Sequence, residues 1–304
     1  QFLFDHKDAS GRPDLSWCLY LFDGGTNFGF MAGPSNNRPV TTSYDYDAPV
    51  DELGRITPKY RMLRDMYQKE LDLTLPPIPP DPRVISIPAI TLRPDGSLLA
   101  HVPTTGPAVI RSKDVQSMED IGQNYGFTLY RKAFANGIHG TLTLPVVRDY
   151  AWIMVDGRVV KDGLTTPPPR GRGERAGGRR GGGRAATTES LSVAINQNGA
   201  CELEILVHDL GRTSSPFDQA HSRKGLIEDP VLGETPLTGW QIVALPLHDP
   251  AAMPITRPGD KTAGLGPTFY HATFNISDPG ETYLDMRDWH FGVVWVNGHN
   301  LGRY

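Results

Sequence analysis

The feature that most constrains this chain is a run of five prolines within the seven residues 76–82. Proline fixes its own φ, removes a backbone donor and disfavours helix in the residue before it, so neither a helix nor a central strand continues through the run. Pro-rich segments are extended and act as stiff spacers. Residues 76–86 are therefore predicted to be a linker, and we expect separate domains on either side of it.

The residues just before the linker are predicted to form a helix. Thr57 and Pro58 open the segment, with proline at the first-turn position that helices favour. Apolar side chains then recur at helical spacing, at Tyr60, Leu63, Tyr67 and Leu71. Further upstream, residues 14–22 form an apolar run typical of a strand buried on both faces in a parallel sheet or barrel.

The chain beyond the linker has an all-β pattern. Short apolar segments, several alternating with polar residues at period two, are separated by turn residues, which predicts antiparallel strands. The predicted strands cover residues 84–88, 126–131, 140–145, 150–155, 190–195 and 201–207, then 240–245, 268–274, 282–285 and 292–296. The dipeptides Asp156-Gly157 and Asn198-Gly199 favour tight turns. This pattern predicts a mainly β fold of two jelly-roll or β-sandwich domains, residues 87–215 and 216–304.

Composition restricts the classes of partner. The net charge of −4 gives no reason to expect nucleic acid or an anionic membrane, and no apolar run is long enough to cross a bilayer. Cys18 and Cys201 are too few and too far apart for a disulfide framework or a zinc site, so both are interpreted as small buried hydrophobic residues. Residues 167–186 are rich in Arg and Gly and lack apolar periodicity, which predicts disorder. We interpret them as an erroneous or frame-slipped stretch in preference to a true insertion.

Three motifs near the start connect the chain to a known family. Residues 22–30 read Phe-Asp-Gly-Gly-Thr-Asn-Phe-Gly-Phe, residues 42–49 read Thr-Ser-Tyr-Asp-Tyr-Asp-Ala-Pro, and residues 57–60 read Thr-Pro-Lys-Tyr. In this order and separation they resemble the end of the catalytic barrel of family 35 glycoside hydrolases, which are β-galactosidases. Segments at 118–127, 149–157, 206–212, 223–225, 237–240 and 292–304 resemble the family's β-domains. Asp23 departs from the pattern, because the family usually has an uncharged residue or histidine there.

The resemblance implies a fold and a reaction. Residues 1–75 are expected to be the C-terminal remnant of a (β/α)8 barrel. The parent enzyme is expected to be a retaining exo-β-galactosidase that acts through a covalent glycosyl-enzyme, without a metal or organic cofactor, and to be secreted, periplasmic, lysosomal or vacuolar. The family's two catalytic glutamates precede the Gly-Gly-Thr-Asn turn, and residues 1–19 contain no glutamate. We therefore expect both to lie upstream of Gln1, and this chain alone to be inactive.

The resemblance also implies where substrate is contacted. Tyr46 is expected to lie against galactose, because a phenol offers both a hydrogen bond and an apolar face. Packing beneath the loop is the alternative for this residue. Asn27 is a weaker candidate, which either bonds the substrate or fixes its own turn. Tyr44, Asp45 and Asp47 are expected to hold the loop in place.

Other residues that attract a functional interpretation are better explained structurally. Gly24-Gly25 lacks the lysine and fingerprint of a nucleotide site. Tryptophans on strands are expected in the core more often than on a sugar-stacking surface; these are Trp152, Trp240, Trp289 and Trp295. His290 and His299 lack the spacing of metal ligands. Two other functions stay open. Residues 87–304 would act as a free-standing carbohydrate-binding module, or residues 167–186 as a nucleic-acid binder.

Overall fold

The computed structural model describes residues 5–11, 16, 18–30, 32–33, 42–164, 190–212, 223–248 and 266–304. The predicted disordered segment 167–186 lies outside the described residues. Within them the fold is mainly β, as predicted. The helices are α2 (Pro58–Leu71) and a short 3-10 turn, η1 (Leu98–His101). The strands are β1 (Gly25–Thr26), β2 (Ser43–Tyr44), β3 (Arg93–Ser97), β4 (Ile110–Ser112), β5 (Phe127–Phe134), β6 (Gly137–Leu144), β7 (Val147–Arg148), β8 (Tyr150–Val155), β9 (Arg158–Leu164), β10 (Leu191–Asn198), β11 (Cys201–His208), β12 (Gly225–Leu226), β13 (Val231–Leu232), β14 (Thr235–Pro236), β15 (Trp240–Leu245), β16 (Thr268–His271), β17 (Val293–Val296) and β18 (His299–Arg303).

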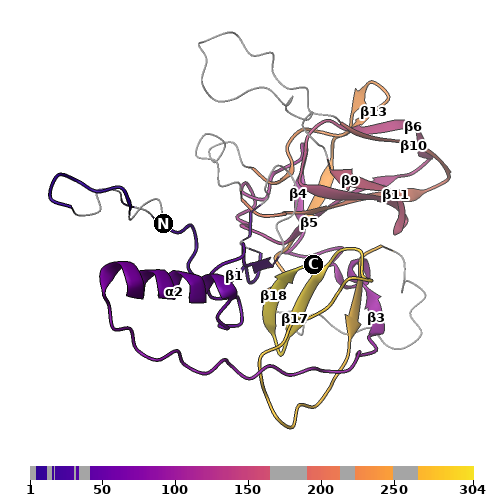
Figure 1. The fold of residues 1–304 in the computed structure, drawn as a ribbon. Coiled ribbons are helices and arrows are strands. Elements are labelled where there is room, and N and C mark those ends of the chain that lie inside the picture. The colour runs from indigo at the N-terminus through magenta and orange to yellow at the C-terminus, as the bar shows by residue number, and fades with distance from the viewer. Residues whose placement is uncertain are drawn as a thin grey trace.

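A β-sandwich forms the largest part of the structure (Figure 1). Its larger sheet has six strands in the order β4-β15-β5-β11-β8-β9, and its smaller sheet has four in the order β10-β6-β13-β14. Neighbouring strands in both sheets run antiparallel. Asp156 and Gly157, at the turn between β8 and β9, have φ of 49° and 74°, which is the left-handed conformation that the predicted hairpin requires.

The six-stranded sheet is buried on both faces. Side chains alternate between the faces of a strand, so a sheet covered on both sides needs apolar residues at consecutive positions. On β11, Ile205 packs into the core between the two sheets, and its neighbour Leu206 packs into a second core on the outer face. The continuous apolar run at residues 205–207 follows from this double burial.

A smaller β-unit covers the outer face of the six-stranded sheet. In this unit β3 pairs with β16, and β17 pairs with β18. Phe269, Val293 and Trp295 of the unit pack against the outer core. The end of the linker also joins it, because Val84 forms a parallel bridge with Glu281. The unit therefore combines residues 83–101 with residues 266–304.

The sheets do not follow the expected domain boundary between residues 215 and 216. β13, β14 and β15 lie beyond that boundary but are strands of the sandwich, whereas β3 lies before it and pairs with β16. Trp240 and Ile242 of β15 explain the difference, because both are buried in the core between the sandwich sheets. Local alternation predicts that a segment is a strand, but it does not say which strand lies beside it.

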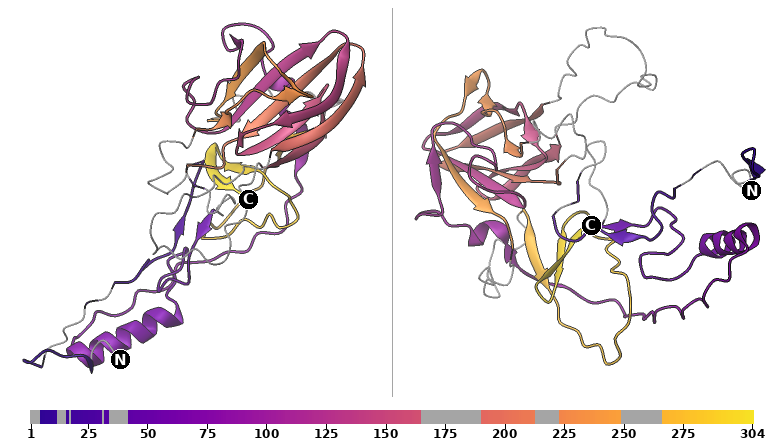
Figure 2. Two further views of the ribbon diagram at one scale, coloured as in Figure 1. Left: turned by 90° about the horizontal axis from the view of Figure 1, so that it is seen from above. Right: turned by 90° about the vertical axis from the view of Figure 1, so that its left-hand side faces the viewer.

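The N-terminal part of the chain projects away from the sandwich, as Figures 1 and 2 show for α2. The predicted helix is confirmed, with Pro58 in its first turn and Leu63 as its buried residue. Residues 73–83 form neither helix nor strand, and Val84, within the predicted linker 76–86, forms the isolated bridge to Glu281. Among the described helices none is both long and apolar enough to span a membrane.

Several sequence-based expectations need correction. The described residues of the predicted buried strand 14–22 contain no strand, and Tyr20 and Phe22 are 77% and 51% exposed. A strand buried on both faces needs a paired strand on each side, and in the described structure the nearest bridge is the single one between Asp23 and Val50. Cys18 is exposed and only Cys201 is buried, so the interpretation as a buried hydrophobic residue holds for Cys201 alone. The strands predicted at 84–88 and 282–285 are also wrong: in the first only Val84 forms an isolated bridge, to Glu281, and residues 282–285 form no strand.

Candidate functional site

A short hairpin-like ladder brings the two motif segments together. β1 and β2 pair antiparallel, with Gly25 opposite Tyr44 and Thr26 opposite Ser43. The carboxylate of Glu52 accepts hydrogen bonds from both Thr26 Oγ1, at 2.5 Å, and Ser43 Oγ. Glu52 therefore fastens the two strands together from a third segment.

The predicted site residue Tyr46 lies on the loop that follows β2. Tyr46 and Asp47 both adopt left-handed backbone conformations, with φ of 48° and 53°, and the Ala48 amide closes the turn by donating to the Asp45 carbonyl at 3.0 Å. Lys59, in the first turn of α2, pairs with the Asp47 carboxylate at 2.7 Å. This turn leaves the Tyr46 side chain 69% exposed, so the residue does not pack beneath the loop.

Tyr46 is one of three tyrosines that touch one another at the surface. Its ring centroid lies 4.6 Å from that of Tyr44 and 6.3 Å from that of Tyr20. The hydroxyls of Tyr20 and Tyr44 are 2.9 Å apart, and this hydrogen bond is the main reason why the pKa of Tyr44 rises to about 12. The Tyr44 hydroxyl is thus engaged within the protein, which supports the expected loop-holding role of Tyr44.

Two acidic residues beneath the loop, Asp45 and Asp51, have different surroundings. Desolvation alone would raise the pKa of Asp51, but hydrogen bonds from the Arg55 backbone amide and guanidinium hold it below its usual value. Burial, then the neighbouring carboxylates of Asp51 and Glu52, raise the pKa of Asp45. The Asp45 carboxylate faces Gly24 so closely that a Cβ at residue 24 would collide with it. Asp51 therefore holds the loop through Arg55, whereas Asp45 Oδ1 is buried against Gly24 without a hydrogen-bond partner.

The second predicted residue, Asn27, follows β1 at the far end of the same ladder. Its amide donates to the Thr42 carbonyl at 2.6 Å. Counting along the ladder, Asn27 is opposite Thr42, four residues from Tyr46. Asn27 therefore lies at the end of the ladder away from the Tyr46 loop. A ligand that touched both would contact them with different parts of its surface.

The remaining sequence candidates take structural positions. Trp240 is 1% exposed, and its indole nitrogen donates to the Leu237 carbonyl at 3.0 Å. Trp152 and Trp295 pack against the outer core, and half-buried Trp289 lies edge-on to Tyr270. The described residues contain no group of three His, Cys, Asp or Glu side chains that could hold a metal ion.

The structure also shows a buried polar centre that the sequence analysis did not single out. Lys224 is 2% exposed and pairs with the carboxylates of Asp149, at 2.6 Å, and Asp209, at 3.5 Å. His208 stacks on Phe127, and burial followed by the positive charges of Arg303 and Lys224 lowers the pKa of His208 well below its ordinary value. The available signal was the His-Asp pair directly after the apolar run of β11, since charged residues are rarely fully buried unless they are paired.

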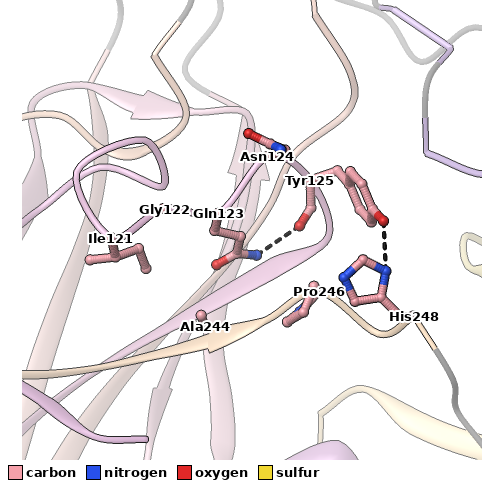
Figure 3. A pocket seen from close by; sticks show the side chains of 8 residues that line it. All are labelled: Ile121, Gly122, Gln123, Asn124, Tyr125, Ala244, Pro246 and His248. Carbon is pink, nitrogen blue, oxygen red and sulfur yellow. Dashed lines mark hydrogen bonds between the residues drawn. The ribbon is translucent and has the colours of Figure 1, made fainter.

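A small cavity lies at the edge of the sandwich (Figure 3). Its volume is about 200 Å³, and the Tyr125 hydroxyl lies 2.6 Å from His248 Nδ1 at its rim. The Gln123 side chain is already committed, because its amide donates to the carbonyls of Tyr125 and Phe127. Ligand sites are usually about 300–1,000 Å³ and offer free polar groups, so this cavity is a weaker candidate than the Tyr46 loop.

Comparison with known proteins places these features in a family. Residues 6–70 match the family described as Glycosyl hydrolases family 35, and residues 267–304 match Beta-galactosidase, galactose-binding domain. A β-galactosidase from Xanthomonas manihotis is 38% identical over 300 residues, covering 96% of this chain and 46% of that protein. The chain is homologous to family 35 β-galactosidases.

Other relatives agree. The β-galactosidase-1-like protein of Mus musculus is 33% identical, and the alignment covers 94% of this chain and 43% of that protein. The β-galactosidase of Homo sapiens is 30% identical, and the alignment covers 94% of this chain and 42% of that protein. The chain spans less than half the length of these β-galactosidases. A solved structure of a β-galacturonidase from Eisenbergiella tayi is 15% identical, and the superposition covers 45% of this chain and 23% of that chain. Its TM-score of 0.24 is too low to indicate a shared fold.

The two family matches meet in space. The family 35 segment contains the β1–β2 ladder, the Tyr46 loop and almost all of α2, whereas the galactose-binding segment contains β16, β17 and β18. The Gly29 amide donates to the Asn300 carbonyl at 3.1 Å, and Thr42 Oγ1 donates to the Arg303 carbonyl at 2.7 Å. In this β-galactosidase homologue, strand β18 therefore lies directly against the ladder that carries Asn27.

Proposed function

We propose that this chain is part of a retaining exo-β-galactosidase that removes terminal β-D-galactosyl residues, and that it supplies substrate contacts without the two catalytic carboxylates. The observation that carries the proposal is the Tyr46 loop inside the family 35 match. The loop is braced by the Lys59–Asp47 pair, and it presents an exposed ring and hydroxyl. A rigidly held phenol suits a galactoside, which has both hydroxyl groups and apolar C–H faces.

The carboxylates around this loop support the second part of the proposal. Retaining glycosidases use two carboxyl groups about 5–5.5 Å apart, one as acid/base and one as nucleophile, with the glycosidic bond between them. Here Asp51 is bonded to Arg55, Glu52 fastens the ladder, and Asp47 pairs with Lys59. Each of these three has a structural partner, and the Asp45 carboxylate, whose Oδ1 is buried without a hydrogen-bond partner, lies against Gly24. We propose that the catalytic glutamates come from sequence outside residues 1–304 and that this chain alone has no hydrolytic activity.

A chimaeric enzyme tests the proposal. The first part of the Xanthomonas manihotis β-galactosidase, up to the start of its alignment with this chain, is fused to residues 1–304. We expect the fusion to hydrolyse a chromogenic β-galactoside and residues 1–304 alone to give no turnover above a buffer control. Proton NMR of the first turnovers should show β-galactose, the anomer that retention produces. A soluble, folded fusion without activity, or turnover by the chain alone that survives purification, contradicts the proposal.

The alternative of a free carbohydrate-binding module rests on the galactose-binding match at residues 267–304. The tryptophans do not favour it, because Trp240 is buried and Trp152 and Trp295 pack against the outer core. Titration of residues 87–304 with galactose, followed by NMR, separates the two. Specific saturable binding by this segment, together with an inactive fusion, favours the module.

A further inference from the structure

The C-terminal strand β18 contacts the N-terminal motif segment through Asn300, Gly302 and Arg303. The Asn300 carbonyl accepts from the Gly29 amide at 3.1 Å, as described above. Gly302, with φ of 122°, lies so close to the ladder that a Cβ there would be 2.5 Å from Thr42 Oγ1 and 3.1 Å from the Asn27 carbonyl oxygen. The backbone of β18 is thus fitted to the segment that carries Asn27.

Arg303 completes this contact with a buried side chain. It is 4% exposed, and its guanidinium donates to the carbonyls of Phe30 at 3.1 Å, Ala32 at 3.0 Å and Asp209 at 2.7 Å. Phe30 directly follows Gly29 and Ala32 is two residues further on, whereas Asp209 directly follows strand β11. One planar group therefore joins the family 35 segment, the sandwich and β18.

The surroundings of Arg303 show that this arrangement is specific. A buried charge is costly unless hydrogen bonds satisfy it, and no carboxylate within the described residues forms an ion pair with Arg303. The guanidinium instead relies on backbone carbonyls, on His208 Nε2, to which its Nε donates at 3.5 Å, and on the face of Phe30, 5.5 Å from its centre. Phe30 is itself buried between Tyr125, His208 and Trp295. The Phe30 carbonyl is consequently held by its hydrogen bond from Arg303 and by the packing of the Phe30 ring, and the Ala32 carbonyl by its hydrogen bond from Arg303.

We propose that Arg303 is a positioning residue: it fixes the backbone between Gly25 and Ala32, and through Thr42 it sets the Asn27 candidate contact. Two hydrogen bonds through Thr42 form the link. Its hydroxyl donates to the Arg303 carbonyl at 2.7 Å, and its own carbonyl accepts from the Asn27 amide at 2.6 Å. The positioning of the backbone does not depend on the enzymatic activity, whereas its consequence for substrate binding rests on the proposed function.

Amide hydrogen exchange of the full chain tests the positioning directly. Lysine has one donor centre and cannot span three separated carbonyls, so Arg303→Lys should release the segment. We expect the exchange of the Asn27 and Gly29 amides to accelerate by about tenfold or more, with β6 and β10 unchanged. The matched control is Arg131→Lys, because Arg131 is also 4% exposed and donates to the Pro103 carbonyl at 3.1 Å, away from this segment. Unchanged exchange at Asn27 and Gly29 in Arg303→Lys overturns the proposal.

A milder variant covers the case in which Arg303→Lys does not fold. Thr42→Val keeps the shape of the side chain and removes only the hydroxyl that donates to Arg303. It should accelerate the same two amides in the same direction, and parental rates in this variant overturn the proposal.

Kinetics of the active fusion separate this inference from the proposed function. If Asn27 contacts substrate, Arg303→Lys should raise KM for a β-galactoside by about fivefold or more with kcat within about twofold, while Arg131→Lys leaves KM unchanged. Faster exchange with an unchanged KM supports the positioning and refutes the substrate contact of Asn27. Parental exchange with any kinetic result refutes the positioning.

Discussion

Gly24 and Gly25 are identical neighbours with unequal surroundings. A Cβ at residue 24 would collide with the Asp45 carboxylate and lie 2.8 Å from the Glu52 amide nitrogen, whereas a Cβ at residue 25 would have nothing within 4 Å. Glycine is thus required at residue 24 by the close approach of the acidic loop. This gives the motif a steric role in place of the phosphate-binding role that glycine pairs suggest.

The first prediction compares alanine at these two positions. Gly24→Ala should push the acidic loop away and lower the stability of the ladder by about 1–3 kcal/mol, because the backbone of Glu52 cannot yield as a flexible side-chain end does. Gly25→Ala should change stability by less than about 0.5 kcal/mol. Exchange of the Gly24 amide, which donates to Val50, measures the effect. Equal effects of the two substitutions would show that the contact is not limiting.

The second prediction concerns the Tyr46 hydroxyl. In the active fusion, Tyr46→Phe keeps the ring and removes the hydroxyl, which should cost about 1–3 kcal/mol of transition-state binding, or roughly tenfold to a hundredfold in kcat/KM. The melting temperature should barely change, because the side chain is 69% exposed. Tyr44→Phe is the control and should instead lower stability modestly, since it breaks the bond to Tyr20. A kcat/KM within about twofold of the parent would assign Tyr46 to the loop structure alone.

At the scale of elements, α2 and the sandwich strands differ in how they are held. The buried residue of α2 is Leu63, and Met62 on the same helix is 63% exposed. β5, β8 and β11 have neighbours on both sides in the sheet and cores on both faces. Local opening therefore requires far less surface exposure for α2 than for the central strands.

The third prediction is that the helical region opens before the sandwich. Limited proteolysis should cleave within or before the Pro76–Pro82 linker while the central strands β5, β8 and β11 remain protected. Mass spectrometry of the early fragments identifies the cleavage sites. Cleavage in the central sandwich strands at the same rate as near α2 would contradict this order.

At the scale of the whole molecule, the buried polar centre joins parts that are distant in sequence. His208 ends β11 and Asp209 follows it, Lys224 precedes β12, and Arg303 ends β18. Burial raises the pKa of Asp209, with Lys224 opposing the shift, and burial lowers the pKa of Arg303 against the attraction of Asp209 and Asp149. Hydrogen bonds and ion pairs of this centre therefore connect the sandwich, β18 and the motif segment where the three meet.

The fourth prediction follows from His208. Its lowered pKa means that below about pH 6.5, the ordinary histidine value, the unfolded chain takes up a proton that the folded chain does not. The contribution of neutral His208 to the free energy of unfolding should therefore be complete above that pH. On acidification below it, the free energy of unfolding should fall by at most about 1.4 kcal/mol per pH unit. The raised pKa of Asp209 acts in the opposite direction at lower pH, because the folded state then protonates first. Urea unfolding at pH 7.5, 6.5 and 5.5 measures the slope.

His208→Gln provides the control for this prediction. The substitution removes the titrating group while keeping a polar side chain of similar reach. The variant should be less stable than the parent overall. Its free energy of unfolding should nevertheless fall less between pH 6.5 and 5.5, because its unfolding takes up about one proton fewer. An identical slope in parent and variant would exclude His208 as the source.

Local chemistry in the sequence was enough to predict several elements. The period-two alternation located β5, β6, β8, β10, β11 and β15, and Thr57-Pro58 with its helical spacing located α2. The same reasoning failed for residues 14–22, because a continuous apolar run becomes a strand only where neighbouring strands complete its hydrogen bonds. The Tyr46 loop was found through its motif, since no local rule distinguishes an exposed phenol from a packed one.

The sequence by itself determined the mainly β texture, the helix, the Pro-rich segment and the resemblance to family 35, because each depends on residues a few positions apart. Only the tertiary structure decided that β15 joins the six-stranded sheet, that β3 pairs with β16, and that Arg303 holds the Phe30 carbonyl, 273 positions away. Strand partners and the burial of a charge depend on contacts between distant segments. The free energy of those contacts is realised only when the whole chain has packed.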